Sequence, residues 1–588
     1  MKISTKKEDG ENEMTCKRKV TIFIFVTLLL FSSVSCQDSW SRREANNDRS
    51  IGNFEDCGSI SSGTKSESSI GTSINDHLTA SVPQIVWQKC LGGSRLDEAN
   101  SVQQTADGGC IVAGDTNSTD GDVSGNRGAR DAWLVKLDSV STIQWQKCLG
   151  GSRYDEANSV QQTTDGYIVA GDTNSNDDDV SGNHGNYDAW VVKLDSVSTI
   201  QWQKCLGGSR YDYAINIQQT TDGGYIVAGL TNSTNGDVSG NHGNYDAWVV
   251  KLDSVGNIQW QKCLGGSHNE EANSVQQTAD RGYIVVGDTN STDGDVSGNH
   301  GNYDAWVVKL DSAGNIKWQK CLGGSRYDEA NSVQQTADGG YIVAGDTNSI
   351  DGNVKGNHGN YDSWVVKLDK VGNIRWQKCL GGSRNEEAIS IQQITDKGYI
   401  VAGDTNSTDG DVSGNHGDYD SWVVKLDSIG HIQWQKCMGG SAYDDSWSAR
   451  QTTDGRYIAA GLTFSNDGDV SGNHGNGDAW AVKLDAPPST PNTPSGPRSG
   501  FIRRPYRYST SAIDPDGEQI KYTFDWGDGT TSVTGLIDSG KRAIASHLWF
   551  KPGNYRVRVM ATDSVGSSSG WSRTLTVTEE IPIALVAG

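Results

Sequence analysis

Short segments rich in β-branched and aromatic residues alternate with polar connections through most of the chain, most clearly in residues 316–369. The first segment alternates apolar and polar residues, and the third is continuously apolar, as in a strand that is buried on both faces. Gly, Asn and Asp fill the connections, and the longest connection precedes the last segment. The pattern therefore predicts four β-strands in this unit. They span residues 316–324, 332–336, 341–347 and 363–369.

The same unit recurs along the chain at a fixed spacing of 57 or 58 residues. A constant period of this length indicates a repeat fold, and four strands per repeat is typical of a β-propeller blade. No proline lies between Pro83 and Pro487, as expected where many strands must donate backbone hydrogen bonds. The string WQKCLGGS, or a close variant, starts at Trp87, Trp145, Trp202, Trp260, Trp318, Trp376 and Trp434.

The two ends of the repeat array complement each other. The first Trp-containing strand, residues 84–91, has no preceding strands of its own unit, and the last unit has no Trp-containing strand after Leu484. Pairing these ends completes a seventh blade and removes two free strand edges, whereas an open solenoid would need polar caps. We therefore predict an all-β protein, with a seven-bladed propeller over residues 84–485 that is closed by its N-terminal strand.

The repeat has recognisable relatives. A unit such as DAWVVKLDSAGNIKWQKCLGGSRYDEANSVQQTADGGYIVAGDTNS resembles the SBBP-type β-propeller repeat of exported prokaryotic proteins, through its AWVVKLD, LGGS…DEA and DGGYIVAG elements. The resemblance covers residues 84–485. It implies a propeller at the cell surface, and it implies no catalytic residues.

The C-terminal part resembles a different family. Residues 494–578 are similar to a PKD domain, through DPDGEQIKYTFDWGDGTTS and HLWFKPGNYRVRVMATDSVG. The resemblance implies an immunoglobulin-like β-sandwich, and members of that family tend to serve in adhesion or spacing. We place the sandwich at residues 498–578, with a stiff Pro-rich linker at 486–497 before it and a tail at 579–588 after it.

The N-terminal part is typical of an exported protein. Residues 20–34 are apolar, follow three basic residues and precede small ones, so residues 1–36 are predicted to be a signal peptide or signal anchor. We expect translation to start at Met14. Cys36 is a candidate for lipidation, and residues 37–83 are predicted to be a flexible Ser/Asn-rich spacer. Membrane contact is expected only through this segment or through a lipid on Cys36.

Charge and cysteine placement exclude several classes of partner and site. The chain has 50 basic and 73 acidic side chains and a formal net charge of −23, which argues against nucleic acid as a partner. Cys90 and its six repeat equivalents are expected to lie too far apart in successive blades to form disulfides. Zinc ligands need clusters that this spacing does not provide. We therefore expect these cysteines to be buried core residues.

Because successive strands alternate in direction, the loop over residues 324–331 and the long loop over 348–362 should emerge on the same face. Binding residues are concentrated on such loops. The predicted ligand-binding residues are Trp447, which lies outside the repeated Trp pattern, and six long-loop histidines. Each histidine could bind metal with partners in its own loop, such as Asp295 or Asp304 beside His300, or could make a hydrogen bond that structures the loop. The histidines are His184, His242, His300, His358, His416 and His474.

Acidic residues suggest calcium as a cofactor. Asp115 and Asn117 have the i, i+2 spacing of a calcium loop, but Asp120 stands where that loop needs glycine. The alternative is a set of turns and a solvated acidic face. The calcium candidates are Asp115, Asn117, Asp514, Asp516, Asp525 and Asp528.

Four long loops begin with a glycosylation sequon, at Asn117, Asn232, Asn290 and Asn406. These asparagines are candidate glycosylation sites in an exported protein. The alternative is a turn sequence that was copied by duplication.

No nucleophile elbow, HExxH motif, phosphate loop or Cys–His pair occurs, so we do not expect an enzyme. The sequence predicts an extracellular, cell-surface module for binding, adhesion or structure, whose long-loop face contacts a surface protein or a polysaccharide. One alternative is a surface polysaccharide hydrolase or lyase that uses the acidic face. A second alternative is a purely structural component of the envelope.

Overall fold

The computed structural model describes residues 83–582, which form thirty-five β-strands and no helix. Nothing in this range forms a helix long and apolar enough to cross a membrane. The predicted signal segment 1–36, its Cys36 and residues 37–82 of the predicted spacer lie outside the described residues, as does the end of the predicted tail.

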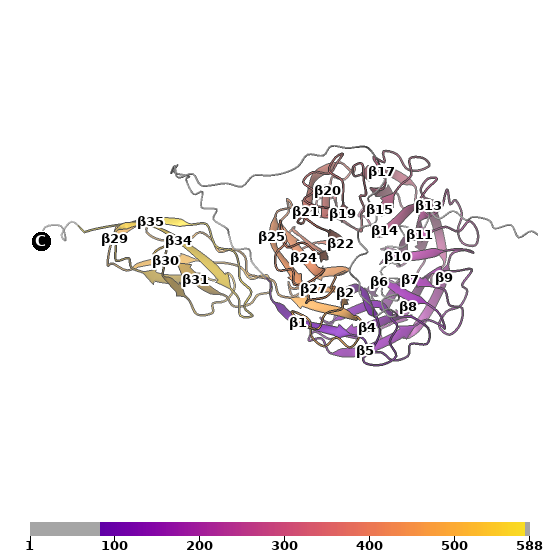
Figure 1. Ribbon diagram of the computed structural model, residues 1–588, viewed down its shortest axis with the longest axis horizontal. Coiled ribbons are helices and arrows are strands. Elements are labelled where there is room, and N and C mark those ends of the chain that lie inside the picture. Colours follow the sequence, from indigo (N-terminus) through magenta and orange to yellow (C-terminus); the bar gives the residue numbers. More distant parts are fainter. Residues whose placement is uncertain (1–82, 583–588) are drawn as a thin grey trace, which may run out of the picture. The chain divides into compact units, whose positions relative to one another are not determined.

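Seven four-stranded antiparallel sheets follow one another along residues 85–484, which confirms the predicted blades (Figure 1). Figure 1 shows β2, β6, β10, β14 and β22 near the centre and β5, β9, β13 and β25 at the periphery. Blades 1 to 3 contain β2 (Asp97–Gln104), β3 (Cys110–Thr116), β4 (Asp131–Leu137), β5 (Ile143–Leu149); β6 (Asp155–Thr163), β7 (Gly166–Thr173), β8 (Asp188–Asp195), β9 (Ile200–Leu206); and β10 (Asp212–Gln219), β11 (Tyr225–Thr231), β12 (Asp246–Leu252), β13 (Ile258–Leu264). Blades 4 to 6 contain β14 (Glu270–Gln277), β15 (Tyr283–Thr289), β16 (Asp304–Leu310), β17 (Ile316–Leu322); β18 (Ser332–Gln335), β19 (Tyr341–Thr347), β20 (Asp362–Leu368), β21 (Ile374–Leu380); and β22 (Glu386–Gln393), β23 (Tyr399–Thr405), β24 (Asp420–Leu426), β25 (Ile432–Met438).

The seventh blade joins the two ends of the array, as predicted. It contains β26 (Ser448–Gln451), β27 (Tyr457–Thr463), β28 (Asp478–Leu484) and, from the start of the array, β1 (Ile85–Leu91). β1 pairs antiparallel with β28 and places Cys90 opposite Trp480, whose indole N–H donates to Gln88 Oε1 at 2.9 Å. The N-terminal strand therefore closes the propeller.

The seventh blade contacts the first blade in the same way as other neighbouring blades contact each other. The N–H of Ala279 in blade 4 donates to Gln335 Oε1 in blade 5 at 2.8 Å, and the N–H of Thr453 in blade 7 donates to Gln104 Oε1 in blade 1 at 2.7 Å. Asp97 N–H also donates to Gly477 O at 2.9 Å. Apolar residues of both blades form one buried cluster. The array is therefore continuous around the ring.

The repeated tryptophans pack within and between blades. Trp306 is 2% exposed, and its indole N–H donates to Gln319 Oε1 at 2.8 Å. Trp318 is half-buried and meets Tyr341 of the next blade edge to face, with ring centroids 5.8 Å apart. Buried aromatic side chains of this size remove about 150–250 Å² each from water. The recurrence of Trp in every blade is therefore explained by packing.

The second strand of most blades is longer than predicted. In β2, β6, β10, β14 and β22 it begins at the Asp or Glu that we assigned to the preceding loop. A one-residue bulge, between Ala99 and Ser101 in blade 1, interrupts the pairing. A bulge shifts the two-residue alternation of side chains, so the sequence pattern made the first half of the strand look like a loop.

The predicted core position of the repeated cysteines agrees with the structure. Every cysteine among residues 83–582 is buried and unbridged. Burial raises the pKa of the Cys321 thiol to about 12. These thiols therefore serve as small apolar core residues.

The C-terminal part is a β-sandwich around a core that includes Trp526, Trp549 and Tyr508. The predicted linker 486–497 is hydrogen bonded to this sandwich: Ser489 N–H donates to Ile513 O and Ser495 N–H to Ser509 O, both at 2.8 Å. The prolines lack N–H groups, but the residues between them still donate. The sheets have the strand orders β29-β35-β34-β31-β32 and β30-β33, with β29 (Ser499–Phe501), β30 (Tyr506–Thr510), β31 (Lys521–Asp525), β32 (Thr531–Val533), β33 (Ala543–His547), β34 (Gly553–Thr562) and β35 (Leu575–Glu580).

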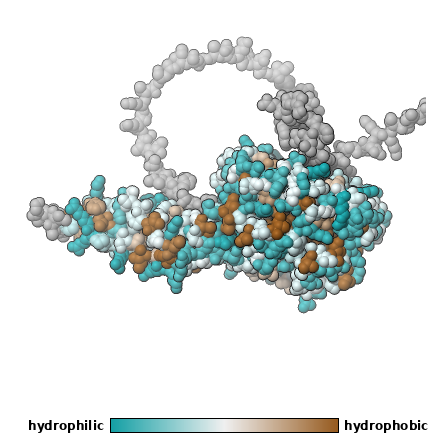
Figure 2. Space-filling view, turned by 90° about the horizontal axis from the view of Figure 1, so that it is seen from below, coloured by the Kyte–Doolittle hydropathy of each residue, from teal (hydrophilic) through white to brown (hydrophobic). Residues whose placement is uncertain are grey.

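The face shown in Figure 2 is mostly hydrophilic, and its hydrophobic residues lie in small separate patches. Single exposed apolar residues such as Val140 and Val255 occupy the short turns of the outer hairpins. The described residues on this face therefore form no broad apolar patch of the kind that often marks a binding surface.

Gly287→Ala should destabilise the propeller. A Cβ at this position in β15 would lie 1.9 Å from Glu271 O of β14, and the paired strands cannot move apart without losing their hydrogen bonds. We expect a loss of about 1–3 kcal/mol in the free energy of unfolding, measured by chemical denaturation. Gly535→Ala is the control, because nothing lies within 4 Å of the added Cβ. An unchanged midpoint in Gly287→Ala would contradict the tight pairing.

Candidate functional site

The structure gathers two loops of every blade on one face, which we call the long-loop face. In blade 1 these loops are residues 92–96 and 117–130. Asp122 N–H donates to Gly92 O and Ser94 N–H donates to Asp120 Oδ1, both at 2.8 Å. Ala129 N–H donates to Arg153 O of blade 2 at 3.1 Å, and this joins neighbouring blades. The face is therefore a continuous, hydrogen-bonded array of loops.

The six predicted histidines lie on this face, and each pairs with an aspartate of its own loop. His300 Nδ1 lies 2.5 Å from Asp304 Oδ2, and His300 N–H donates to the same carboxylate oxygen at 3.1 Å. The His300 side chain is 40% exposed, whereas Asp304 is fully buried. Burial raises the pKa of Asp304, and the hydrogen bond from His300 opposes that shift. The equivalent pairs are His184–Asp188, His242–Asp246, His358–Asp362, His416–Asp420 and His474–Asp478.

This pairing supports the structural role of the histidines over metal binding. Among the described residues, the cluster whose ligand atoms lie close enough together to share a metal ion contains no histidine. Each of these histidine side chains remains partly exposed, so the histidines can still contact a ligand on the long-loop face.

Asp115, a calcium candidate, lies in the interior of the blade. It is 1% exposed and forms an ion pair with Arg130, which also contacts Glu98 at 2.8 Å and Glu156 of the next blade at 3.1 Å. Burial raises the pKa of Asp115 well above its usual value, and the charge of Arg130 opposes the shift. The Asp115 carboxylate is thus paired with Arg130. This pairing does not support the predicted calcium site, in which Asp115 and the half-buried Asn117 would bind the same ion.

Equivalent buried carboxylates occur around the ring. Asp288 and Asp404 are 1% and 4% exposed, and burial raises the pKa of each well above its usual value, with further contributions from Glu271 and Glu387. In blade 7, burial raises the pKa of Asp445 to about 8 against an opposing hydrogen bond from a backbone N–H. Several carboxyl groups inside the propeller therefore have a raised pKa and bind a proton more readily than exposed carboxyl groups do.

Blade 3 departs from this pattern. Tyr213 and Leu230 replace its two carboxylates, and Tyr213 stacks with Tyr187 and Tyr211 at centroid distances of 5.8 and 6.3 Å. Tyr187 and Tyr211 also stack on each other at 6.0 Å. Aromatic stacking therefore takes the place of charge at this point of the ring.

Sequence analysis missed a set of exposed residues on the long-loop face. In six of the seven repeats the residue after GGS is exposed, and it is arginine in five of them and histidine in one; the residue that follows is often tyrosine. Tyr154 is 41% exposed and Tyr211 is 37% exposed. Because these residues lie directly after the GGS string, the sequence alone could have identified them as a repeated set. The basic residues and the histidine are Arg95, Arg153, Arg210, His268, Arg326 and Arg384.

Trp447 is half-buried, and it lies at the bulge next to β26 instead of on the outer loops. Its N–H donates to Ala460 O at 2.9 Å, and its side chain hydrogen bonds to Asp445. In blade 1 this position holds Asn100, which donates to Ala157 O of the next blade at 3.1 Å. The structure thus places Trp447 in the inner strand layer.

The sequon asparagines take part in the loop structure. The Oδ1 atoms of Asn232, Asn290 and Asn406 accept backbone N–H groups at 2.8–2.9 Å, and the serine after each asparagine is fully buried. Asn117 is half-buried. These hydrogen bonds and the buried serines support a structural role for the repeated N-S-T sequence. Glycosylation of the asparagines remains a prediction.

The four calcium candidates of the sandwich lie in two groups. Asp525 is the last residue of β31 and contacts Arg558 at 3.0 Å, and Asp528 follows the strand and contacts His547 at 2.8 Å. Asp514 and Asp516 precede β31, at its opposite end. The four residues therefore do not form one site.

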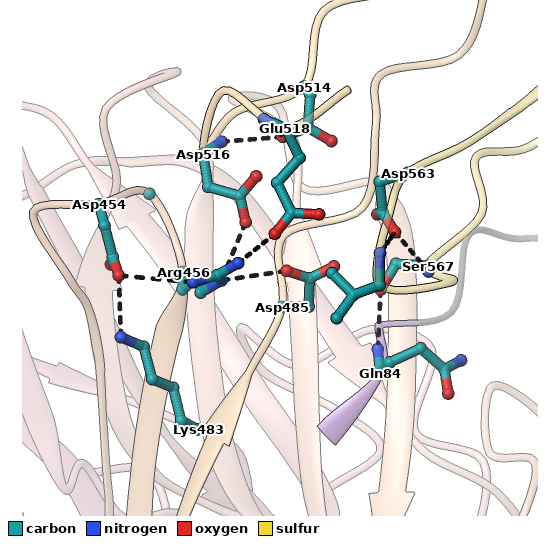
Figure 3. A network of polar contacts seen from close by, with 12 residues as sticks. Gln84, Asp454, Arg456, Lys483, Asp485, Asp514, Asp516, Glu518, Asp563 and Ser567 are labelled. Carbon is teal, nitrogen blue, oxygen red and sulfur yellow. Dashed lines mark hydrogen bonds and ion pairs between the residues drawn. The ribbon is translucent and has the colours of Figure 1, made fainter. Parts of the chain in front are cut away.

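Asp516 instead joins residues that the sequence analysis did not single out. The carboxylate oxygens of Asp485, Asp516 and Glu518 lie within 4.8 Å of one another. Figure 3 shows them around Arg456, with Asp514 and Asp563 close by. Asp485 follows β28 directly, so the propeller and the sandwich both contribute. The alternating acidic residues at 514, 516 and 518 were a signal that the sequence contained.

Comparison with known proteins identifies the sandwich. Residues 497–576 match the PKD domain family. The PKD domain of an M14-like peptidase from Thermoplasmatales archaeon SCGC AB-540-F20 is 42% identical, over 16% of this chain and 97% of that structure, with a TM-score of 0.15. No curated protein matches the chain. PKD domains usually occur in extracellular or surface proteins.

The buried carboxylates should make the propeller more stable in mild acid than in base. Asp445 keeps its proton up to about pH 8 in the folded state but loses it near pH 4 when unfolded. The folded state therefore binds more protons between these values, and stability falls as the pH rises from about 4 to about 8. The melting temperature should be several degrees higher at pH 5 than at pH 9. Asp445→Asn should flatten this slope, and exposed Asp178→Asn should not. An equal slope in Asp445→Asn would contradict the assignment.

Proposed function

We propose that this protein is an exported cell-surface binding module whose long-loop face binds a polysaccharide. The observation that carries the proposal is the ring of exposed arginine, tyrosine and histidine side chains on that face. These side chains recur at the same position in successive blades, on loops that are hydrogen bonded to one another.

The side chains suit carbohydrate recognition. Guanidinium and imidazole groups donate hydrogen bonds in fixed planes, and a tyrosine ring offers an apolar face with a polar end. Arg153 is followed by Tyr154 and Arg210 by Tyr211, and all four side chains are exposed. Neighbouring blades therefore present a similar pair.

The repetition favours a polymer over a single small ligand. Near-identical subsites around a ring can engage successive units of a repeating chain, and several weak contacts then add to a much stronger overall affinity. The hydrogen-bonded loops need little ordering upon binding, which reduces its entropic cost.

The location of the protein is part of the proposal. The PKD domain is of a kind that is usual in extracellular and surface proteins. The predicted signal segment and the resemblance of the repeats to SBBP-type propellers support the same location. A role in adhesion would follow from polysaccharide binding at that surface.

The substitutions Arg153→Ala, Arg210→Ala and Arg326→Ala, combined in the full-length protein, should weaken polysaccharide binding at least tenfold. They remove three hydrogen-bonding groups, from the subsites of blades 2, 3 and 5. A glycan array identifies the polysaccharide, and biolayer interferometry measures the apparent Kd. The control combines Arg281→Ala and Arg375→Ala, which are also exposed but lie in or near the short turns of the opposite face.

Each other outcome of this experiment identifies a different function. Depolymerised or unsaturated products would overturn the binding proposal in favour of a hydrolase or a lyase. Binding to a surface protein without binding to any glycan would replace the ligand class. Absence of binding to both would favour a purely structural envelope component.

A further inference from the structure

The propeller meets the sandwich where the ring closes. Gln84 N–H, just before β1, donates to Ser567 Oγ of the sandwich at 3.0 Å, and Asp485 N–H donates to Gln84 O at 2.9 Å. A Cβ at Gly455 in the propeller would lie 2.7 Å from Pro515 O. The two domains are therefore in direct contact beside the closing strands.

Five carboxylates surround this contact, and we call them the junction cluster (Figure 3). One comes from the end of the propeller, three from the loop before β31 and one from the end of β34. The cluster consists of Asp485, Asp514, Asp516, Glu518 and Asp563.

Three of these carboxylates accept hydrogen bonds through one of their two oxygens, from backbone N–H groups or from arginine. Asp514 Oδ1 accepts the N–H groups of Asp516 and Glu518 at 3.2 and 3.0 Å. Asp563 Oδ1 accepts three N–H groups, including that of Ser567 at 2.8 Å. Asp485 Oδ1 accepts Arg456 Nε at 3.1 Å. These bonds fix the orientation of the carboxylates.

The remaining oxygens are buried and have no hydrogen-bond donor. They include Oδ2 of Asp485, Asp514 and Asp563, and Oδ1 of Asp516. The side chains of Asp485 and Asp516 are 1% and 2% exposed, and Asp514 and Asp563 are 3% and 1% exposed as residues. A buried carboxylate oxygen without a donor is costly, so these atoms point to a missing positive partner.

The positive charge at the junction does not balance this cluster. Arg456 contacts Asp485 and Asp516 at 3.1 Å and also Glu518, whereas the nearby Lys483 is paired with Asp454 at 2.8 Å. One arginine thus contacts three of the five carboxylates, and among the residues that the structure describes no cation is paired with Asp514 or Asp563.

We propose that the junction cluster binds a calcium ion that joins the last propeller strand to the sandwich. The ligand atoms are all oxygens, which is the ligand set of calcium, and the three carboxylates whose oxygens lie within 4.8 Å of one another leave room for water in its usual six to eight positions. Asp485, Asp516 and Glu518 are the ligands, and the buried carboxylates of Asp514 and Asp563 add negative charge beside them.

The position gives this ion a role beyond the sandwich. Asp485 follows β28, and the neighbouring Gln84 precedes β1, so the ion stabilises the residues at which the ring closes as well as the domain contact. Release of calcium should loosen the sandwich from the propeller and weaken the closing pair of strands.

Calcium titration of the full-length protein, after treatment with a chelator, tests the proposal. Calorimetry should show one Ca²⁺ bound per chain, and saturating Ca²⁺ should raise the melting temperature by at least about 3 °C. Asp485→Asn and Asp516→Asn should each bind Ca²⁺ at least tenfold more weakly. Asp528→Asn is the matched control, because it is the same substitution at the opposite end of β31, and it should bind as the unsubstituted protein does.

Loss of folding can be separated from loss of the site. Asparagine keeps the shape of aspartate and one of its acceptor oxygens, so both cluster variants should unfold cooperatively in chelator within a few degrees of the unsubstituted protein. No binding to the unsubstituted protein at millimolar Ca²⁺ would overturn the proposal. Unchanged affinity in Asp485→Asn would show that the propeller supplies no ligand, and would overturn the link between the domains.

Discussion

The antiparallel pairing of β1 with β28 is the interaction on which the rest of the propeller depends. It joins segments nearly four hundred residues apart, as the bond from Trp480 to Gln88 shows. Without it, blade 7 would have three strands and a free edge, and the core that blade 7 shares with blade 1 would lose Leu91. Because closure brings all seven blades into one ring, it also places their long loops on one continuous face.

The fold was predictable because repetition amplifies weak signals. A single blade would be difficult to distinguish from other β-hairpins, but seven copies with the same apolar alternation and an incomplete unit at each end specify a closed ring. The bulge at Asn100 was not predictable, because it breaks the alternation from which strands are recognised. The contacts of the Pro-rich linker were not predictable either, because its composition is that of a spacer, yet the residues between its prolines donate hydrogen bonds to the sandwich.

The candidate sites were less predictable, because they depend on which residues the fold brings together. The local sequence offered two possible partners for His300, Asp295 and Asp304, and the structure shows that Asp304, four residues ahead, is the one. The burial of Asp115 against Arg130 was not predictable, because the sequence does not show that β3 turns this side chain inward. Asp485 and Asp516 are far apart in the chain, so only the contact between the domains reveals that they share a site. The long-loop face and the junction cluster have separate tasks in this account: the first contacts the ligand, and the second secures the ring that presents it.

Thermal unfolding of the full-length protein without residues 84–91 tests the closed ring most directly. Our account predicts that this deletion exposes the edge of β28, lowers the melting temperature of the propeller by well over about 5 °C and promotes association through the free edge. A propeller that unfolds at the same temperature and remains monomeric without these residues would contradict the account.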